Sequence, residues 1–434
     1  MKSSKRVVVT GIGPLTSMGI GKNDLWHNLR KEKPVVTRQT IKLDKEEWGT
    51  FHYHKVKNFN IHKYGISQEA LEWIKDWKEG DETIDLFYLI ASIQLALCDA
   101  ALPSRSSLKH PFGLVVSHEN INLLPFLSKI TAKAYELFRN NKKSLTKKQF
   151  YDILYHDCLK SGYDTQPFMT LFHVAKVFNV HQFSLFICNA CASGVYAIET
   201  GAQMIKNGQN SVVVVSAADK TDIYKYLWFK DLGIYSPDGI MRPFAENSNG
   251  IVFGDGGIGL VLEDLEHARK RNAFIYAEYL GGGFSLESWQ VTVPKIGSDS
   301  YQTAILNALA RSNVTTKEVD LVCPHGVGSR VIDYYESKAL TDIFGKNFQK
   351  PFLTAFKPYI GHNLGGSALM ETAILLMCLN KNTILPTLNT GTERKDFNLS
   401  VVKKELKQHL NTVLKVSCAF AGFNAAAIFR KIEN

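Results

Sequence analysis

The amino-acid sequence predicts an α/β fold, and two observations carry that prediction. Short runs of β-branched and apolar residues recur along the chain and end in small residues. Continuous apolar strands of this kind are typical of sheets covered on both faces. Helix-like stretches lie between these runs, which is the alternation expected of α/β proteins. A chain of 434 residues is long for one simple core, so we expect two domains or one large two-part domain.

The elements follow in order along the chain. The predicted strands are Arg6–Thr10, Phe112–Ser117, Phe183–Cys188, Ser211–Ser216, Ile258–Glu263, Asp320–Cys323 and Val413–Ser417. The predicted helices are Ile84–Ala101, Gly194–Asn207, Ser300–Ser312, Ile332–Phe344 and Ser367–Leu379. Residues 41–77 are rich in Lys, Trp and His without a clean period, and we interpret them as surface elaboration.

The composition, 45% hydrophobic and 21% charged, is that of an ordinary soluble globular protein. No run of roughly 18 apolar residues occurs, so no membrane span is predicted. The apolar stretch after Lys5-Arg6 is too short for a signal peptide. We therefore expect a cytoplasmic protein without a membrane partner.

The formal charge of +10 favours a polyanionic partner. No nucleic-acid-binding motif accompanies the charge, so nucleic acid is not expected. An acidic carrier protein fits the charge as well as a solvated surface does. The basic residues of 129–150 are interpreted as a solvated amphipathic helix or hairpin rather than a docking patch.

Cys191 is the first candidate nucleophile. It lies between a predicted buried strand and the predicted start of a helix, among the small residues Ala190, Ala192 and Gly194. A thiol at such a turn faces open space, and the field of the helix N-terminus favours its thiolate. The other cysteines lie mostly in apolar runs, and seven scattered cysteines do not form a disulfide framework. Cys188 and Cys191 also spell C-x-x-C, but a redox pair would place the first cysteine at the head of the helix.

Two histidines follow predicted strands in the second half of the chain. His325 and His362 each adjoin a glycine at a strand-to-helix junction, where a ligand can approach the backbone closely. Together with Cys191 they suggest a Cys-His-His constellation. Zinc is the weaker alternative because the spacings do not form a metal-ligand array, and no metal is expected.

Further motifs accompany these residues in a fixed order. They are VVVTGIG at 7–13, NACASG at 189–194, RPF at 242–244 followed by GIVFGDG at 250–256, HG at 325–326 with Asp333 and Glu336, Lys357 with GH at 361–362 and Glu371, and AFAGFN at 419–424. Over nearly its whole length the chain thereby resembles the elongating β-ketoacyl-acyl carrier protein synthases of the thiolase-like superfamily. Each motif alone is weak, whereas their order is specific.

The resemblance implies a decarboxylating condensation. Cys191 would hold an acyl group taken from the phosphopantetheine of an acyl carrier protein, and no bound cofactor would be needed. His325 and His362 would stabilise the charge that develops on a malonyl-type thioester as carbon dioxide leaves. The backbone N–H groups of Cys191 and Phe420 would form the oxyanion hole. The remaining implied residues are Lys357 and Glu371 as a buried ion pair, Phe420 as the gating aromatic, and Ser329, Gly422 and Asn424 as substrate-binding positions.

The resemblance also implies an architecture, a five-layer αβαβα sandwich of two similar halves. The halves would be residues 1–265, enlarged by insertions and carrying the nucleophile, and residues 266–434, carrying both histidines. The partner would be an acyl carrier protein, and the chain would form a dimer through the strand Phe183–Cys188. The second subunit is either another copy or a related chain-length factor that lacks the cysteine.

Several positions depart from the family pattern. Val327 and Gly328 replace small polar residues, and Ala419 and Ala421 replace glycines around Phe420. Acidic residues stand where some relatives have a basic carrier contact: Glu79, Asp81 and Glu82. These departures favour a specialised fatty-acid or polyketide pathway, with the ketosynthase subunit of a type II polyketide synthase as one possibility.

Three alternatives are weighed against this interpretation. A thiolase would use Cys418 as a second cysteine, but the pair His325 and His362 is typical of a decarboxylating synthase. A non-catalytic chain-length-factor-like protein would not need the complete trio. A dinucleotide-binding fold is excluded because Gly11-Ile12-Gly13 lacks the third glycine.

Overall fold

The computed structural model describes residues 5–43, 46–74, 84–119, 123–140, 146–346 and 350–432. Glu79, Asp81 and Glu82, and part of the basic stretch 129–150, lie outside these residues. The strands are β1 Val7–Thr16, β2 Gly19–Ile20, β3 Thr37–Leu43, β4 Glu46–His54, β5 Gly113–Ser117, β6 Ser184–Ile187, β7 Val212–Asp219, β8 Phe253–Gly254, β9 Gly256–Asp264, β10 Ala277–Leu286, β11 Leu321–Cys323, β12 Phe352–Leu353, β13 Thr383–Ile384, β14 Leu406–Lys407, β15 Thr412–Cys418 and β16 Phe423–Arg430.

Helices alternate with these strands, and short 3-10 turns complete the connections. The helices are α1 Lys22–Leu29, α2 Gln68–Glu72, α3 Ile84–Asp99, α4 Leu123–Asn140, α5 Lys147–Asp164, α6 Pro167–Phe178, α7 Ser193–Lys206, α8 Ile223–Asp231, α9 Leu265–Lys270, α10 Ser300–Ser312, α11 Arg330–Phe344, α12 Lys357–Ile360 and α13 Ser367–Lys381. The 3-10 turns are η1 Ile61–Tyr64, η2 Thr316–Glu318, η3 Leu364–Gly366, η4 Lys395–Phe397 and η5 Phe420–Gly422.

One mixed sheet runs through the described residues in the order β12-β11-β15-β16-β10-β1-β9-β7-β5-β6. Its two ends have the same pattern. β6, β5 and β7 are parallel and continue into antiparallel β9 and β1, while β12, β11 and β15 are parallel and continue into antiparallel β16 and β10. The predicted boundary after residue 265 lies between β9 and β10, and we retain this division as a proposal.

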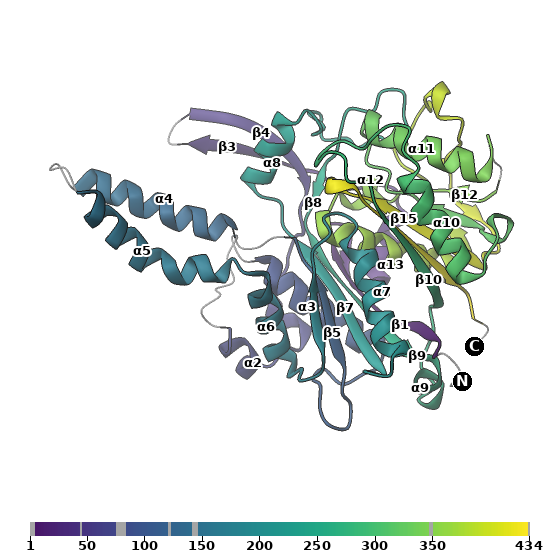
Figure 1. The fold of residues 1–434 in the computed structure, drawn as a ribbon, viewed down its shortest axis with the longest axis horizontal. Helices are drawn as coiled ribbons and strands as arrows, with labels where there is room; N and C mark the ends of the chain where they lie inside the picture. The colour runs from purple at the N-terminus through teal and green to yellow at the C-terminus, as the bar shows by residue number, and fades with distance from the viewer. Residues whose placement is uncertain are drawn as a thin grey trace.

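The layers of the α/β fold follow from the core clusters. α7 and α13 pack together in the core cluster that also contains residues of β1, β7, β9 and β15, so they form a central helical layer. α3 covers the outer face of β1, β7 and β9, and α10 covers β10 and β16. The described residues thus form the predicted αβαβα sandwich, seen edge-on in Figure 1.

Two insertions enlarge the first half. Residues 41–77, interpreted as surface elaboration, include part of the hairpin β3–β4, which pairs with β8. α4 and α5 form a helical hairpin that projects from the body (Figure 1). The described residues of the basic stretch 129–150 lie mostly on α4 and the start of α5, in agreement with the predicted helix or hairpin. Among the described residues, no helix combines the length and the apolar character needed to cross a membrane.

Candidate active site

Cys191 lies at the tip of a sharp turn between β6 and α7. Ala190, just before it, takes a left-handed φ of 47°, which costs a non-glycine residue roughly 1–2 kcal/mol. Ser193 holds the turn, because its hydroxyl donates to the carbonyl of Ala190 at 2.6 Å and accepts from the N–H of Asn189 at 2.7 Å. The turn therefore presents the Cys191 side chain beyond the end of the strand, as the sequence predicted.

Gly194 brings this turn close to the second half of the protein. A Cβ at this position would lie 2.5 Å from the backbone nitrogen of Leu369 on α13. Glycine is therefore required for α7 and α13 to approach each other. This contact links the helix that follows the cysteine to the helix that follows His362.

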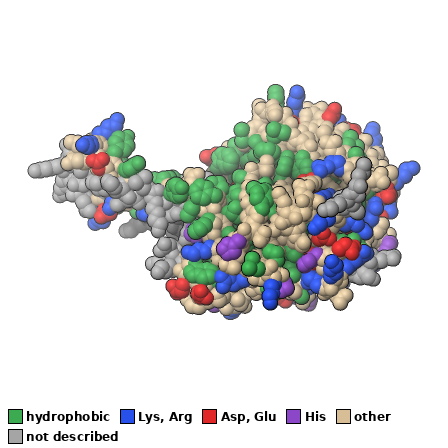
Figure 2. Space-filling model, turned by 60° about the horizontal axis from the view of Figure 1, so that its bottom comes forward, with side chains coloured by type: hydrophobic (Ala, Val, Ile, Leu, Met, Phe, Trp, Pro, Cys, Tyr) green, Lys and Arg blue, Asp and Glu red, His purple; other side chains and the backbone are tan. Residues whose placement is uncertain are grey.

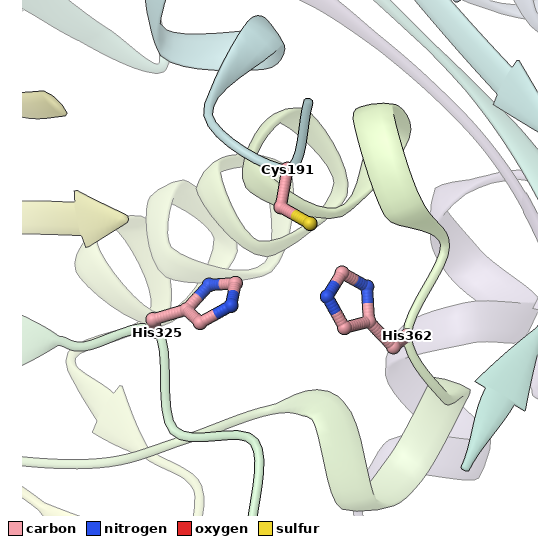
Figure 3. Close-up of side chains that lie close together, drawn as sticks. All are labelled: Cys191, His325 and His362. Atoms are coloured by element: carbon pink, nitrogen blue, oxygen red, sulfur yellow. The ribbon is translucent and has the colours of Figure 1, made fainter. Parts of the chain in front are cut away.

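The three predicted reactive side chains converge. Cys191, His325 and His362 are all buried, and their ligand atoms lie within 4.8 Å of one another. The two imidazole rings have centroids 5.3 Å apart and are tilted by 79°. Figure 3 shows the cysteine and both rings pointing toward one shared space. One bound thioester can therefore contact all three.

His325 is held by a buried carboxylate and a buried amine. Glu336 accepts the backbone N–H groups of His325 and Gly326 at 2.6 and 2.7 Å. The amine of Lys357 donates to the His325 carbonyl at 2.5 Å and lies 3.3 Å from Nδ1 of the ring. Because an ammonium group can only donate, Nδ1 accepts and the ring hydrogen is on Nε2, which faces the shared space.

The predicted ion pair Lys357–Glu371 has a third member. One oxygen of Glu371 accepts a hydrogen bond from Lys357 at 2.8 Å, the other forms an ion pair with Lys415 at 2.8 Å, and all three side chains are fully buried. Sequence reasoning missed Lys415, although a lysine inside the otherwise apolar strand Val413–Ser417 is a signal of burial with a partner. Two ammonium groups share one carboxylate, so the group formed by Lys357, Glu371 and Lys415 carries a net positive charge, with the Glu336 carboxylate beside it.

Both histidines are neutral at physiological pH. Burial lowers the pKa of His325 and of His362 well below the usual range, and the charges of Lys357 and Lys415 lower both further. Nδ1 of His362 lies 2.8 Å from the hydroxyl of Ser367, which can donate to it. Two neutral imidazoles with N–H groups on Nε2 can hydrogen-bond a carbonyl oxygen and stabilise negative charge on it.

The predicted stabilisation of the Cys191 thiolate is wrong for the resting site. Burial raises the pKa of the thiol well above its usual value, and the carboxylate of Glu119 raises it further, while Lys357 opposes the shift. The loss of solvent around the sulfur is the largest cause of this shift. The Cys191 side chain is therefore a neutral thiol in the resting site.

A cavity of about 570 Å³ opens above the trio. Its lining includes Cys191, His325 and His362 and also the predicted positions Ser329, Phe420, Gly422 and Asn424. Lys357 and Glu371 do not line it and act from behind His325. The amide of Asn424 donates to Ser300 at 3.1 Å and to the Gly422 carbonyl, so it orders the wall.

The loop around Phe420 rests on a small aromatic cluster. The Phe420 ring stacks on Phe229 at 5.5 Å and meets Trp228 edge-on at 5.7 Å. The next N–H, of Ala421, donates to the Val291 carbonyl at 2.6 Å. The aromatic side chain is therefore held at the cavity wall by contacts that a loop movement would have to break.

Ala421 stores strain in this loop, because its φ is 58°. Ala421→Gly is expected to raise the free energy of unfolding by about 1 kcal/mol, since glycine adopts this conformation without a Cβ clash. Ala419→Gly is the matched control, because Ala419 has an extended φ of −144° and glycine there only adds unfolded-state entropy. Urea unfolding of both variants checks the prediction. Destabilisation by both would contradict it.

Family models and individual relatives among known proteins all indicate the same family for this chain. The model of the beta-ketoacyl synthase N-terminal domain matches residues 140–268, and that of the beta-ketoacyl synthase C-terminal domain matches residues 276–391. A 3-oxoacyl-[acyl-carrier-protein] synthase 2 of Coxiella burnetii is 25% identical over 446 aligned positions, covering 99% of each chain. Nodulation protein E of a Rhizobium species is 25% identical over 440, covering 99% of this chain and all of its own.

Solved structures share the fold. The ishigamide ketosynthase/chain length factor superposes with a TM-score of 0.83 at 25% identity, covering 99% of this chain and 100% of that one. A ketosynthase in complex with a type II polyketide synthase acyl-carrier protein superposes with a TM-score of 0.81 at 22% identity, with the same coverage. Both family models together span more than half of the sequence, and the chain therefore belongs to the beta-ketoacyl synthase family.

Proposed function

We propose that the protein is a β-ketoacyl-acyl carrier protein synthase, with Cys191 as nucleophile and His325 and His362 as the decarboxylation pair. The observation that carries the proposal is the convergence of these three side chains on one cavity, backed by two buried ammonium groups. Neutral N–H donors in front of a net positive charge suit an oxygen that becomes negative.

The reaction proceeds in two half-reactions. The Cys191 sulfur displaces the carrier's phosphopantetheine thiol from an acyl thioester, and that thiol leaves with the proton. A malonyl thioester then binds with its carbonyl oxygen at the Nε2–H groups of His325 and His362. Loss of carbon dioxide leaves an enolate, whose carbon attacks the acyl group on Cys191. The sulfur leaves, regains a proton, and the β-ketoacyl product remains on the carrier.

The backbone N–H groups of Cys191 and Phe420 are the proposed donors to the tetrahedral oxyanion. Losing one such donor typically costs about 3 kcal/mol of transition-state stabilisation. Ser329, Gly422 and Asn424 are the proposed contacts of the pantetheine arm, since all three line the cavity. The direct test is a mixture of acyl carrier and malonyl carrier: the proposal expects carbon dioxide and a β-ketoacyl carrier, and malonyl carrier recovered intact would refute it.

We also propose that the chain forms a dimer, either with a second copy or with a related chain. β6 ends the path of strands in the described sheet, so its outer edge can pair with a second chain. Phe183 before this strand and Phe172 on α6 are about half exposed, and Figure 2 shows hydrophobic side chains on the body beside the projecting hairpin. Native mass measured with and without candidate chain-length-factor partners separates the two assemblies, and a homodimer in both samples would exclude the heterodimer.

The proposed location is the cytoplasm, where acyl carrier protein would supply the substrates. Cell fractionation with an antibody to the chain tests this part separately.

A zinc site is the second candidate, because a cysteine and two histidines at this spacing can hold a metal. The surroundings oppose it, since Lys357 sits against His325 and the buried charge behind the ring is already positive. Removal of metals with a chelator is therefore expected to leave the condensation rate unchanged. Loss of activity on chelation, restored by Zn²⁺, would favour the metal.

A further inference from the structure

The carboxyl ends of three neighbouring parallel strands meet beside the nucleophile. Cys191 follows β6, Ser117 and Glu119 stand at the end of β5, and Asp219 ends β7. Ligands of α/β sheets bind at this edge. The polar side chains at the ends of β5 and β7 take no part in the condensation described above.

Ser117 and Asp219 lie on the face of the sheet that packs against α7, the helix that follows Cys191. Val115 and Ala217 belong to the core beneath α7 and α13. Because strand residues alternate between faces, Ser117 and Asp219 lie on the same face, one step beyond that core. Glu119 lies against η3, since a Cβ on Gly365 would come 3.2 Å from the Glu119 Cβ. That turn directly follows His362.

Four oxygen atoms in this region lack hydrogen-bond partners in the part of the chain that the structure describes. They are Ser117 Oγ, Glu119 Oε2, Asp219 Oδ2 and Asn363 Oδ1, all shielded from solvent, and we call them the acceptor cluster. The Asn363 amide joins the set because it donates to the Asp219 carbonyl at 3.3 Å. Buried polar atoms without partners are costly and are rare without a reason.

The neighbouring charged residues that the structure describes pair with one another and leave Glu119 without an ion-pair partner among them. Lys225 forms ion pairs with Asp219 and Asp222, and His118 lies 3.2 Å from Asp85. Within the described residues, no ion pair joins Glu119 to a cation. Burial raises the pKa of Glu119 to about 7, and its carboxylate acts on the Cys191 thiol. A carboxyl group without a matching cation favours a ligand that brings a hydrogen-bond donor.

A bare metal ion does not fit this region. Among the described residues, the group of His, Cys, Asp and Glu ligand atoms close enough to hold a metal is the active-site trio, and the acceptor cluster forms no such group. An organic donor, which bonds one or two oxygens at a time, makes smaller demands on their spacing.

We propose that Glu119 is a specificity-determining residue that selects acyl groups carrying an N–H or O–H donor close to the thioester. This inference rests on the proposed function, because the acyl group must be held on Cys191. The donor bonds the free Glu119 oxygen, whereas a plain alkyl chain leaves that oxygen buried and unpaired.

The test is the rate at which short thioesters acylate Cys191, followed by intact mass. Butyryl, 3-hydroxybutyryl and 3-aminobutyryl thioesters have matched lengths and differ in the donor. The wild type is expected to react at least about tenfold faster with the two donor thioesters than with butyryl, as one hydrogen bond to a charged group implies. Glu119→Leu is expected to reduce this ratio to about one.

The ratio of donor-thioester to butyryl rates separates substrate selection from thiol reactivity. Removing the carboxylate changes the reactivity of the Cys191 thiol by the same factor for every thioester, so that change cancels in the ratio. Glu119→Gln keeps an acceptor, so it should still favour the hydroxyl and lose the preference for the amine. Glu266→Leu, on a side chain 72% exposed, is the surface control and should behave as wild type.

Equal ratios in wild type and Glu119→Leu would overturn the inference and leave the condensation proposal intact. If no thioester, including a carrier-bound one, acylated Cys191 in the wild type, both proposals would fail. A urea-unfolding midpoint close to that of the wild type shows that the fold of the variant is retained.

Discussion

Cys191→Ala is expected to abolish the covalent acyl adduct and to lower condensation by a thousandfold or more, about the loss seen when a nucleophile is removed from a catalytic unit. The reason is geometric, since no other group described in the structure joins a nucleophile to the two imidazoles. Intact mass after incubation with acyl carrier protein measures the adduct, and product formation on the carrier measures the rate.

Cys418→Ala is the matched control. Cys418 also lines the cavity and is buried, with a pKa raised well above the usual value by burial and by Glu336. It should keep the adduct and most of the rate. A thiolase would need this second cysteine, so an inactive Cys418→Ala beside an acylated wild type would favour that alternative. An adduct that persists in Cys191→Ala would move the nucleophile elsewhere.

Glu371→Leu is expected to lower the free energy of unfolding by about 3–5 kcal/mol, because it leaves two buried ammonium groups, Lys357 and Lys415, without a counter-charge. Without Glu371, the desolvation cost of the two ammonium groups is no longer offset by their attraction to a carboxylate. Urea unfolding monitored by tryptophan fluorescence measures the change.

The triple variant Lys357→Met, Glu371→Leu and Lys415→Met separates stability from function. Apolar replacement of a whole buried charge group is often neutral for stability. The triple variant should therefore fold nearly as well as the wild type. It should also condense slowly, because His325 loses the donor to Nδ1 that fixes its tautomer. Normal activity in the folded triple variant would show that the charge group serves packing alone.

The seven predicted strands and five predicted helices are all present, with ends shifted by a few residues. Two core strands, β10 and β16, were not predicted, because their centres are Gly281-Gly282-Gly283 and Ala425-Ala426-Ala427. Small residues have low strand propensity. They are required here by close packing, since a Cβ at Gly283 would lie 2.0 Å from the Ala304 carbonyl of α10.

The same cause explains why β1 is longer than predicted. The sequence pattern ended the strand at Thr10, whereas the structure continues it through two glycines to Thr16. Cβ atoms at Gly11 and Gly13 would lie 2.3 and 2.1 Å from carbonyl oxygens of α3. By local propensity these glycines indicate the end of a strand. In the folded protein they allow α3 to pack closely against β1.

Site residues that stand in sequence motifs could be predicted. Residues whose role depends on burial beside other charges could not. The cysteine, both histidines and the Lys357–Glu371 pair stand in recognisable motifs. Lys415 and Glu119 stand in no motif and gain their roles from burial next to other charges. The protonation state of Cys191 was predicted with the wrong sign because the sequence shows the helix N-terminus but not the loss of solvent.

The central claim is that one sulfur and two imidazoles form a carbon–carbon bond on a shared thioester. A single-turnover chase tests it most directly: the wild type is acylated, freed of excess substrate, and mixed with malonyl carrier protein. Mass spectrometry of the Cys191 peptide and of the carrier follows both partners together. The account predicts that the acyl mass leaves Cys191 as the carrier gains a β-ketoacyl group and carbon dioxide is released. An acyl group that stays on Cys191, or leaves it as the free acid while the carrier remains malonylated, would contradict the account.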